Sequence, residues 1–204
     1  MIGIINTGIG NIPSVLSALK KIEKDTLLCT NKNDLDKVKK IILPGVGSFK
    51  AFHDKITDTE LFYPIQNRVK NGIPILGICL GFHALFEKSI EYGVFPGLDL
   101  IKGEIVKINS LKEEVKIPHI GWNSCQLNKD SILFKGIKNK SDFYFTHSYT
   151  PINYDKNFVS TFSTYEVDLV SAIEKENIFG VQFHPEKSQK IGLKLLKNFC
   201  EIQC

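Results

Sequence analysis

The sequence predicts an α/β fold in which an open, mostly parallel sheet is flanked by helices and extended by antiparallel strands in the C-terminal half. Over residues 1–90, short apolar runs rich in β-branched residues alternate with segments whose apolar residues recur at helical spacing. This alternation is typical of parallel strands connected by helices. From Gly103 onward, short strand-like segments and turns replace it, which indicates antiparallel additions. With 204 residues, the chain has room for one large domain, residues 1–204, rather than two.

The parallel half is expected to begin with a strand at residues 1–7 and a turn at residues 8–11. The first helix should start near Pro13, because proline suits the first helical turn. Later strands are expected at residues 27–30, 40–43 and 73–78, and later helices at residues 34–39, 58–70 and 82–89. Asp58 is a plausible N-cap for the helix at 58–70, and Asn71-Gly72 would end it.

The C-terminal half is expected to contain short strands and a closing helix. The strands are expected at residues 104–108, 121–127, 143–147, 158–162, 168–175 and 178–183. An amphipathic pattern at about residues 190–202 predicts the helix.

The composition is that of an ordinary globular protein, with 43% hydrophobic and 24% charged residues. The net charge of +4 is slight and the lysines are scattered, so nucleic-acid binding is not indicated. No run approaches the ~18 consecutive apolar residues that a membrane helix needs. The N-terminus lacks the basic segment of a signal peptide. We therefore expect a cytoplasmic protein.

The cysteines are odd in number and lack the spacing of metal ligands. They are Cys29, Cys79, Cys125, Cys200 and Cys204. This pattern favours free thiols in a reducing compartment over a disulfide framework. No metal or cofactor is expected.

The first candidate for chemistry is Cys79, in the stretch Gly77-Ile78-Cys79-Leu80-Gly81. Residues without a Cβ on either side relieve the crowding where a strand reverses sharply into a helix. The Gly-x-Ser-x-Gly elbow holds its nucleophile in this way. A thiol placed here would lie at a helix N-terminus, which favours the thiolate. For Cys79 alone, a buried structural cysteine is an equally good interpretation.

The second candidate is His184-Pro185-Glu186, which follows the last expected strand. In an extended chain, His184 and Glu186 project to the same side. A carboxylate beside an imidazole holds its tautomer and stabilises the imidazolium, as the third member of a Cys-His-acid triad does. His-Pro-Glu alone is weak evidence. Together with the Cys79 motif, it predicts a catalytic triad of Cys79, His184 and Glu186.

With these motifs, the sequence resembles the class I glutamine amidotransferases of the triad type. Within that family it is similar to the glutaminase subunits of imidazole glycerol phosphate synthases in histidine biosynthesis, and the resemblance covers nearly the whole chain. The further motifs that carry it are Gly8-Ile9-Gly10-Asn11, Pro44-Gly45-Val46-Gly47-Ser48-Phe49, Pro118-His119-Ile120-Gly121-Trp122-Asn123, Tyr144-Phe145-Thr146-His147-Ser148-Tyr149 and Gln182-Phe183-His184-Pro185-Glu186-Lys187-Ser188.

The resemblance implies an oxyanion hole beside the thiol. Gly45, Val46 and Gly47 would form its oxyanion strand, and the N–H of Leu80 would be a second donor. One such donor typically contributes ~2.7–4 kcal/mol to transition-state stabilisation. From the spacing of the glycines alone, an ordinary loop is about as plausible.

The resemblance also implies a substrate site and a partner surface. The backbone around His147, Ser148 and Tyr149 would hold the α-carboxylate and amine of glutamine. A partner would contact Asn11, Trp122, Tyr144 and Lys187. Taken without the family, the two aromatic residues are nearly as well explained by core packing, and Lys187 by a solvated surface charge.

The implied reaction is hydrolysis of L-glutamine to glutamate and ammonia through a thioester on Cys79. The ammonia would pass to a (β/α)8-barrel cyclase on a separate chain, which makes imidazole glycerol phosphate and AICAR. Three alternatives remain: a paralogous glutaminase subunit serving another synthase, such as one that amidinates sugars for surface glycans; a stand-alone cysteine γ-glutamyl hydrolase; and a non-catalytic scaffold. The intact triad argues against the last of these.

The sequence departs from the family pattern in three places. Phe82-His83 stands where the family has Met-Gln, Asn6-Thr7 where it has Asp-Tyr, and Pro13 where it has Arg. The Gln of the family helps to hold the substrate. His83 lies four residues after Cys79 and is either a glutamine contact or merely a tolerated polar residue. The departures leave the triad intact and the pathway open.

Overall fold

The computed structural model describes residues 1–203. Its N-terminal half contains strands β1 (Ile2–Ile5), β2 (Thr26–Cys29), β3 (Lys40–Gly45) and β4 (Ile75–Cys79) and helices α1 (Ile12–Lys21), α2 (Lys32–Asp36), α3 (Phe49–Asp58), α4 (Phe62–Lys70) and α5 (Leu80–His83). Next come β5 (Phe86–Ser89), β6 (Phe95–Pro96), β7 (Ile101–Lys107), β8 (His119–Leu127), β9 (Ser141–His147), β10 (Tyr149–Ile152), β11 (Val159–Tyr165), β12 (Val167–Lys175), β13 (Ile178–Val181) and α6 (Gln189–Cys200). Short 3₁₀ turns lie at Ile108–Ser110, Lys156–Phe158 and Pro185–Lys187.

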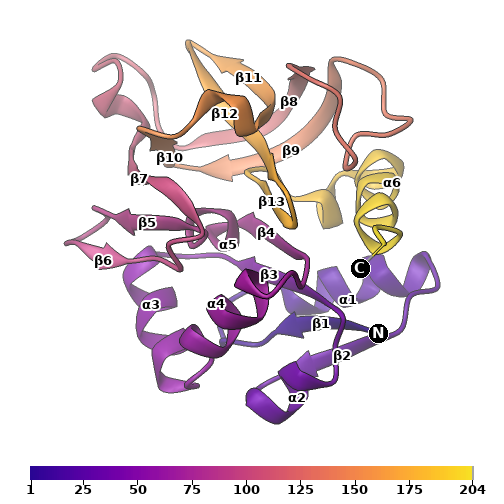
Figure 1. Ribbon diagram of the computed structural model, residues 1–204. Helices are drawn as coiled ribbons and strands as arrows, with labels where there is room; N and C mark the ends of the chain where they lie inside the picture. The colour runs from indigo at the N-terminus through magenta and orange to yellow at the C-terminus, as the bar shows by residue number, and fades with distance from the viewer. Residues whose placement is uncertain (204) are drawn as a thin grey trace.

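The strands form two sheets (Figure 1). Among the described residues, a nine-stranded sheet has the order β2-β1-β3-β4-β13-β12-β11-β8-β9, and a four-stranded sheet has the order β10-β7-β5-β6. In the large sheet, β2, β1, β3, β4 and β13 are parallel neighbours. From β13 through β12, β11 and β8 to β9 the pairing is antiparallel. The predicted α/β fold with antiparallel additions is therefore confirmed.

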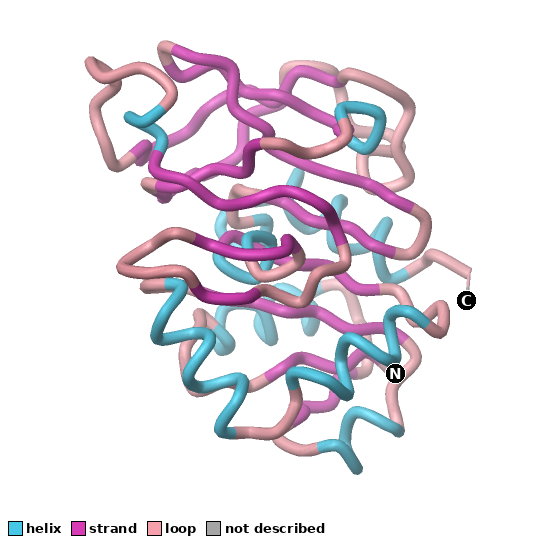
Figure 2. Tube along the Cα trace, turned by 60° about the vertical axis from the view of Figure 1, so that its left-hand side comes forward, coloured by secondary structure: helices cyan, strands magenta, loops and turns pink. Residues whose placement is uncertain are grey.

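The two faces of the parallel strands are covered by different elements. Ile4, Ile42 and Leu76 pack in one core with residues of α1 and α6. Their chain neighbours Ile41 and Ile75 face a second core, built with α3, α4 and the four-stranded sheet. This two-sided burial explains the continuous apolar runs of these strands. Figure 2 shows that most helices gather around the parallel strands, whereas the other end of the molecule is mainly strands and loops.

Strand β13 brings distant parts of the chain together. It pairs in parallel with β4, with Val181 opposite Ile78. Parallel neighbours end at the same edge of a sheet. Cys79, which ends β4, and His184, which follows β13, therefore emerge side by side.

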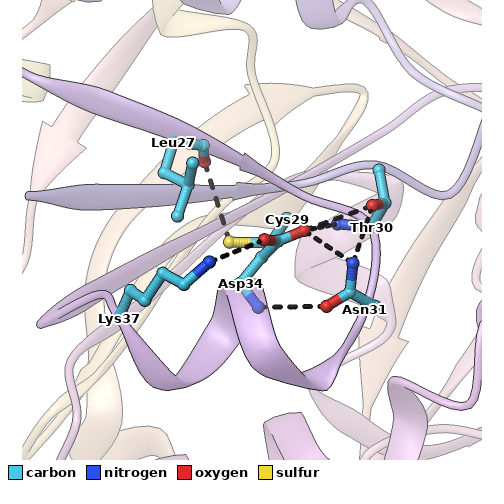
Figure 3. Close-up of polar contacts among 6 residues, drawn as sticks. All are labelled: Leu27, Cys29, Thr30, Asn31, Asp34 and Lys37. Carbon is cyan, nitrogen blue, oxygen red and sulfur yellow. Dashed lines mark hydrogen bonds and ion pairs between the residues drawn. The ribbon is translucent and has the colours of Figure 1, made fainter.

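The short helix expected at residues 34–39 begins earlier, at Lys32, and ends at Asp36. Figure 3 shows the reason: the Asn31 side chain accepts a hydrogen bond from the Asp34 N–H at 3.1 Å and donates one to the Asp34 carboxylate at 2.8 Å. Asn31 is thus an N-cap, a role that the residue type permits but that the apolar pattern does not reveal.

The helix expected at residues 58–70 is wrong in its first part. Asp58 ends α3, which the sequence analysis missed, and α4 begins only at Phe62. The N-cap of α3 is Ser48, whose Oγ accepts a hydrogen bond from the Ala51 N–H at 3.3 Å. The helix stop at Asn71-Gly72 is confirmed, since Asn71 is the C-cap of α4 and Gly72 has φ of 93°.

The helix expected at residues 82–89 is also wrong. α5 is a single turn, and Phe86–Ser89 is strand β5, paired with β6 and β7. The N–H groups of Gly97, Leu98 and Leu100 donate hydrogen bonds to carbonyl groups of residues 84–87. These carbonyl groups would accept from N–H groups further along the same segment if it were a helix. A Cβ on Gly97 would collide with the Phe86 carbonyl oxygen. Tertiary pairing therefore overrides the local helical pattern.

The other predicted strands and the closing helix are present with shifted ends, while β6 and β10 were not predicted. Cys29, Cys79, Cys125 and Cys200 are buried free thiols, and Cys204 lies outside the described residues. Across residues 1–203, no helix is long and apolar enough to cross a membrane. The same residues contain no cluster of His, Cys, Asp or Glu suited to a metal ion.

Candidate active site

A cavity of about 510 Å³ lies where β4 and β13 end. It brings together most of the residues that the sequence predicts to act on the substrate. Those that line it are Val46, Gly47, Cys79, Leu80, His83, His147, Ser148, Tyr149 and His184. Gly45 and Glu186 do not line it but support residues that do.

Cys79 occupies a strained turn. Its φ of 53° and ψ of −105° lie outside the regions that L-residues favour. A Cβ on Gly81 would collide with the Leu43 carbonyl oxygen, and one on Gly77 would lie 2.6 Å from the Gly81 oxygen. The glycines are therefore needed because β4 turns back closely against β3 and α5. The predicted sharp turn from strand to helix at Cys79 is present, but α5 is only one turn long, so its dipole would support a thiolate less than a full helix would.

The Cys79 thiol is buried among polar groups. Its Sγ lies 3.8 Å from the carbonyl oxygen of Thr146 and 3.9 Å from the side-chain Nε2 of Gln182. The Gln182 amide donates toward the sulfur. Neither contact was anticipated from the sequence, because Thr146 and Gln182 are brought to Cys79 only by the sheet.

His184 and Glu186 form a buried, hydrogen-bonded pair next to the thiol. The Nδ1–H of His184 donates to Glu186 Oε1 at 2.8 Å, and the two side chains are 2% and 1% exposed. The other ring nitrogen, Nε2, is buried and has no hydrogen-bond partner within residues 1–203. Burial lowers the pKa of His184, but its interactions with Cys79 and Glu186 outweigh burial and raise that pKa to about 10. The ring is thus set to carry a proton beside the thiol.

The predicted oxyanion strand continues from β3. Gly45 lies opposite Cys79 in the sheet register, and a Cβ on Gly45 would lie 2.9 Å from Leu80 Cβ. Val46 and Gly47 then line the cavity, and Gly47 has φ of 94°. The segment and Leu80 therefore meet beside the thiol.

His83 is buried and paired with Gln182. Its Nε2 lies 2.7 Å from Gln182 Oε1, an acceptor, so this nitrogen carries the hydrogen. Burial lowers the pKa of His83 to about 4, although the Gln182 contact opposes this. His83 is therefore a neutral residue of the cavity wall, linked to the thiol through Gln182.

Two charged residues of the cavity were missed by the sequence analysis. The Glu91 carboxylate is buried, accepts a hydrogen bond from the Phe49 N–H at 2.8 Å, and has a pKa raised by burial. Lys107 ends β7 opposite Tyr149. Both line the cavity. Glu91 follows the segment mistaken for a helix, and Lys107 resembles any lysine at a strand end, so the sequence carries no signal for either.

The residues expected to contact a partner lie mostly in one exposed group. Trp122 and Tyr144 face each other across β8 and β9 with ring centroids 6.0 Å apart, and Trp122 is 50% exposed. The Lys187 ammonium lies 5.7 Å from the Tyr144 ring centroid. Asn11 precedes α1, and its side chain makes no capping hydrogen bond.

Comparison with known proteins agrees with this geometry. The family model described as glutamine amidotransferase class-I matches residues 4–202. The imidazole glycerol phosphate synthase subunit HisH of Pelagibacter ubique is 41% identical, over 98% of both chains. The protein of the same name from Caldanaerobacter subterraneus is 43% identical over the full length of both. A solved structure titled as a glutamine amidotransferase has a TM-score of 0.74 at 17% identity, covering 98% of this chain and 97% of its own.

Proposed function

Because the chain belongs to the class I glutamine amidotransferases, we propose that it is the glutaminase subunit of an imidazole glycerol phosphate synthase. In this role it hydrolyses L-glutamine and supplies ammonia for histidine biosynthesis. Full-length similarity to subunits of that name supports the proposal. The observation that carries the chemistry is one cavity holding the Cys79 thiol and a histidine oriented by a buried carboxylate.

The reaction proceeds in two steps. The Cys79 thiolate attacks the side-chain amide carbon of glutamine, a C–S bond forms, and the negative charge moves to the amide oxygen. Donors on the loop of Gly45, Val46 and Gly47 and on Leu80 would stabilise that oxyanion. His184 gives its proton to the departing nitrogen, the C–N bond breaks, and ammonia leaves. Water then hydrolyses the thioester, with His184 as general base, and regenerates the thiol.

The charges of the cavity suit an α-amino acid. Glu91 supplies a carboxylate for the α-ammonium group of glutamine, and Lys107 an ammonium group for its α-carboxylate. Backbone groups of His147, Ser148 and Tyr149 would complete the contacts to this end of the substrate. An amide without the zwitterionic end group would offer neither Glu91 nor Lys107 a charged partner.

The ammonia must reach an acceptor before it is protonated in water. We propose a (β/α)8-barrel cyclase on a separate chain as the partner. Trp122, Tyr144, Lys187 and Asn11 would contact it. The exposed Trp122 beside the half-buried Tyr144 supports this, since Trp and Tyr are enriched in protein interfaces. We place the enzyme in the cytoplasm, a reducing compartment that suits its buried free thiols.

The test is glutamate release by the purified chain, alone and with the cyclase and its nucleotide ligand. We expect low activity alone and a strong rise with the liganded cyclase. Equal activity in both samples would reject coupling and favour a stand-alone hydrolase. Activation only by a different synthase would identify a paralogous subunit.

A further inference from the structure

A second group of buried polar side chains adjoins the triad but takes no part in its chemistry. His119 and His147 face each other across β8 and β9 and are 3% and 7% exposed. Their rings are hydrogen-bonded, with His119 Nδ1 2.9 Å from His147 Nε2. His147 Nδ1 lies 2.8 Å from the Tyr149 carbonyl oxygen, and Asn123 Nδ2 lies 3.2 Å from His119 Nε2. The four groups form a chain from β8 to the start of β10.

The hydrogens of this chain are determined by the Tyr149 carbonyl, which can only accept. His147 must therefore carry its hydrogen on Nδ1, so Nε2 of the neutral ring is an acceptor. His119 must then donate from Nδ1, and its Nε2 accepts from the Asn123 amide. Asn123 also donates to the Thr164 carbonyl at 3.0 Å. Every ring nitrogen is satisfied only when both histidines are neutral Nδ1–H tautomers.

Packing holds His119 in the orientation that this chain needs. Its ring is stacked on Phe145, with centroids 4.8 Å apart, and on Tyr165, with centroids 4.1 Å apart. A ring held by two stacks and two hydrogen bonds cannot turn without losing several contacts. Burial also lowers the pKa values of His119 and His147, to about 4 and about 3, so both stay neutral near pH 7.

The end of the chain lies at the wall of the active-site cavity. The hydrogen bond from His147 to Tyr149 spans Ser148 and shapes the turn that leads from β9 into β10. His147, Ser148 and Tyr149 all line the cavity, and the preceding carbonyl, that of Thr146, is the one that contacts Cys79 Sγ. The conformation of this turn therefore sets the wall that faces the substrate.

We propose that His119 is a positioning residue for glutamine binding, which acts through His147 by holding the backbone of residues 147–149 against the cavity. The inference rests on the proposed glutaminase function. His119 does not itself line the cavity. Its contribution is a hydrogen bond donated from Nδ1, which keeps His147 in the tautomer that binds the Tyr149 carbonyl.

Two substitutions of equal size separate this role from packing. His119→Asn and His119→Leu both remove the stacked ring, but the Asn side-chain amide can occupy the place of Nδ1–H and donate to His147, whereas Leu cannot. We expect His119→Leu to raise the KM for glutamine about tenfold with little change in kcat, and His119→Asn to restore most of that loss. Equal KM values in the two variants would overturn the proposal.

A measurement on the unaltered protein covers the case in which neither variant folds. Nitrogen-15 NMR of the imidazole rings should show His119 and His147 as neutral Nδ1–H tautomers, whose signals do not titrate between pH 6 and 8. An Nε2–H tautomer at either ring would overturn the proposal. Absence of glutaminase activity in the unaltered protein with its cyclase would instead reject the proposed function, and the tautomers would still report on the histidine chain.

Discussion

Two histidines of one cavity have opposite protonation behaviour. His184 and His147 both line it and are both buried. Burial lowers the pKa of each, but for His184 the interactions with Cys79 and Glu186 outweigh burial and raise the pKa to about 10. The bonded partners of His147 are a carbonyl oxygen and a neutral ring, and its pKa falls to about 3. The partner, more than the burial, therefore determines whether a buried histidine is charged.

This difference separates two tasks within the cavity. On the side of Cys79, His184 and Glu186 (the triad side), a proton held by His184 would be available to the departing ammonia in the proposed reaction. On the other side (the binding side), His119 and His147 support the cavity wall at residues 147–149, and both rings are uncharged near neutral pH. His83 belongs with this second group, since it too is neutral and paired with an amide. Of the three histidines that line the cavity, His184 is therefore the one that is protonated near neutral pH and can give a proton to the departing nitrogen of the substrate.

The largest expected effect is the loss of activity when the Cys79 thiol is removed. We expect Cys79→Ala to abolish glutamine hydrolysis, a loss on the order of 10⁶-fold in kcat, as for other triad nucleophiles. It should also lower the pKa of His184, because one of the two groups that raise it is lost, and leave the tautomer of His147 unchanged. Steady-state glutamate release and NMR titration measure both effects. Cys125→Ala, which removes a buried thiol outside the cavity, is the matched control and should stay active.

Removing the carboxylate should make His184 resemble His147. In Glu186→Gln the ring keeps a hydrogen-bond partner but loses its charge partner, so its pKa should fall below 10 and its tautomer should no longer be fixed. We expect kcat to fall by up to about 10⁴-fold with little change in KM, as when a triad carboxylate becomes an amide. A variant with the original kcat, or with His184 still titrating near pH 10, would show that Glu186 does not set the proton of the ring.

The triad side could be predicted from the sequence, because each of its parts is contiguous. The glycines around Cys79 and the spacing of His184 and Glu186 can be read within a few residues, and the parallel strands that unite them have continuous apolar runs. The oxyanion strand at Gly45, Val46 and Gly47 was expected from the resemblance to the family, because the spacing of its glycines alone fits an ordinary loop about as well. The main errors in the fold are the missed helix α3 at Phe49–Asp58 and the segment Phe86–Ser89, where pairing with residues 95–107 makes a strand of a segment that has a helical pattern.

The binding side was largely hidden in the sequence, because its contacts span long stretches of chain. Glu91 bonds the backbone of Phe49, and Gln182 lies between His83 and Cys79. His119 and Gln182 stand inside recognisable motifs, but nothing in their order along the chain indicates what they touch. These roles depend on sheet register, which a single sequence does not specify for separated strands.

The charge of Lys107 offers a smaller change, confined to the binding side. Lys107→Met should raise the KM for glutamine about 10- to 100-fold with kcat nearly unchanged, since a hydrogen bond to a charged group is lost in the ground and transition states alike. The variant should also lose its preference for glutamine over an analogue whose α-carboxylate is an amide. Lys102→Met is the matched control, because Lys102 lies on the same strand and pairs with Glu87 at 3.1 Å outside the cavity. Equal KM changes in both variants would contradict the assignment.

The smallest expected effect is on the pH dependence of stability, and it has opposite signs for the two groups of histidines. The folded pKa values of His83, His119 and His147 are lowered to about 4, 4 and 3, against ~6.5 when unfolded. Below pH 6.5 the unfolded chain therefore binds more protons at these rings, and stability declines toward pH 4. The folded pKa of His184 is raised to about 10, so its contribution is complete below pH 6.5 and is lost as the pH rises through 10.

Urea unfolding at pH 5, 6.5 and 9 should therefore show greatest stability near pH 6.5, with each ring changing the free energy of unfolding by at most about 1.4 kcal/mol per pH unit on its own side. Comparison of variants isolates these rings from the carboxylates that titrate in the same range. Glu186→Gln should flatten the decline between pH 6.5 and 9 and leave the acid side unchanged. His119→Asn should do the reverse, because it removes one ring that resists protonation and leaves His184 intact. If both variants reduced the loss of stability on the same side of pH 6.5, the two groups of histidines would not differ in charge. The contrast between the triad side and the binding side would then be wrong.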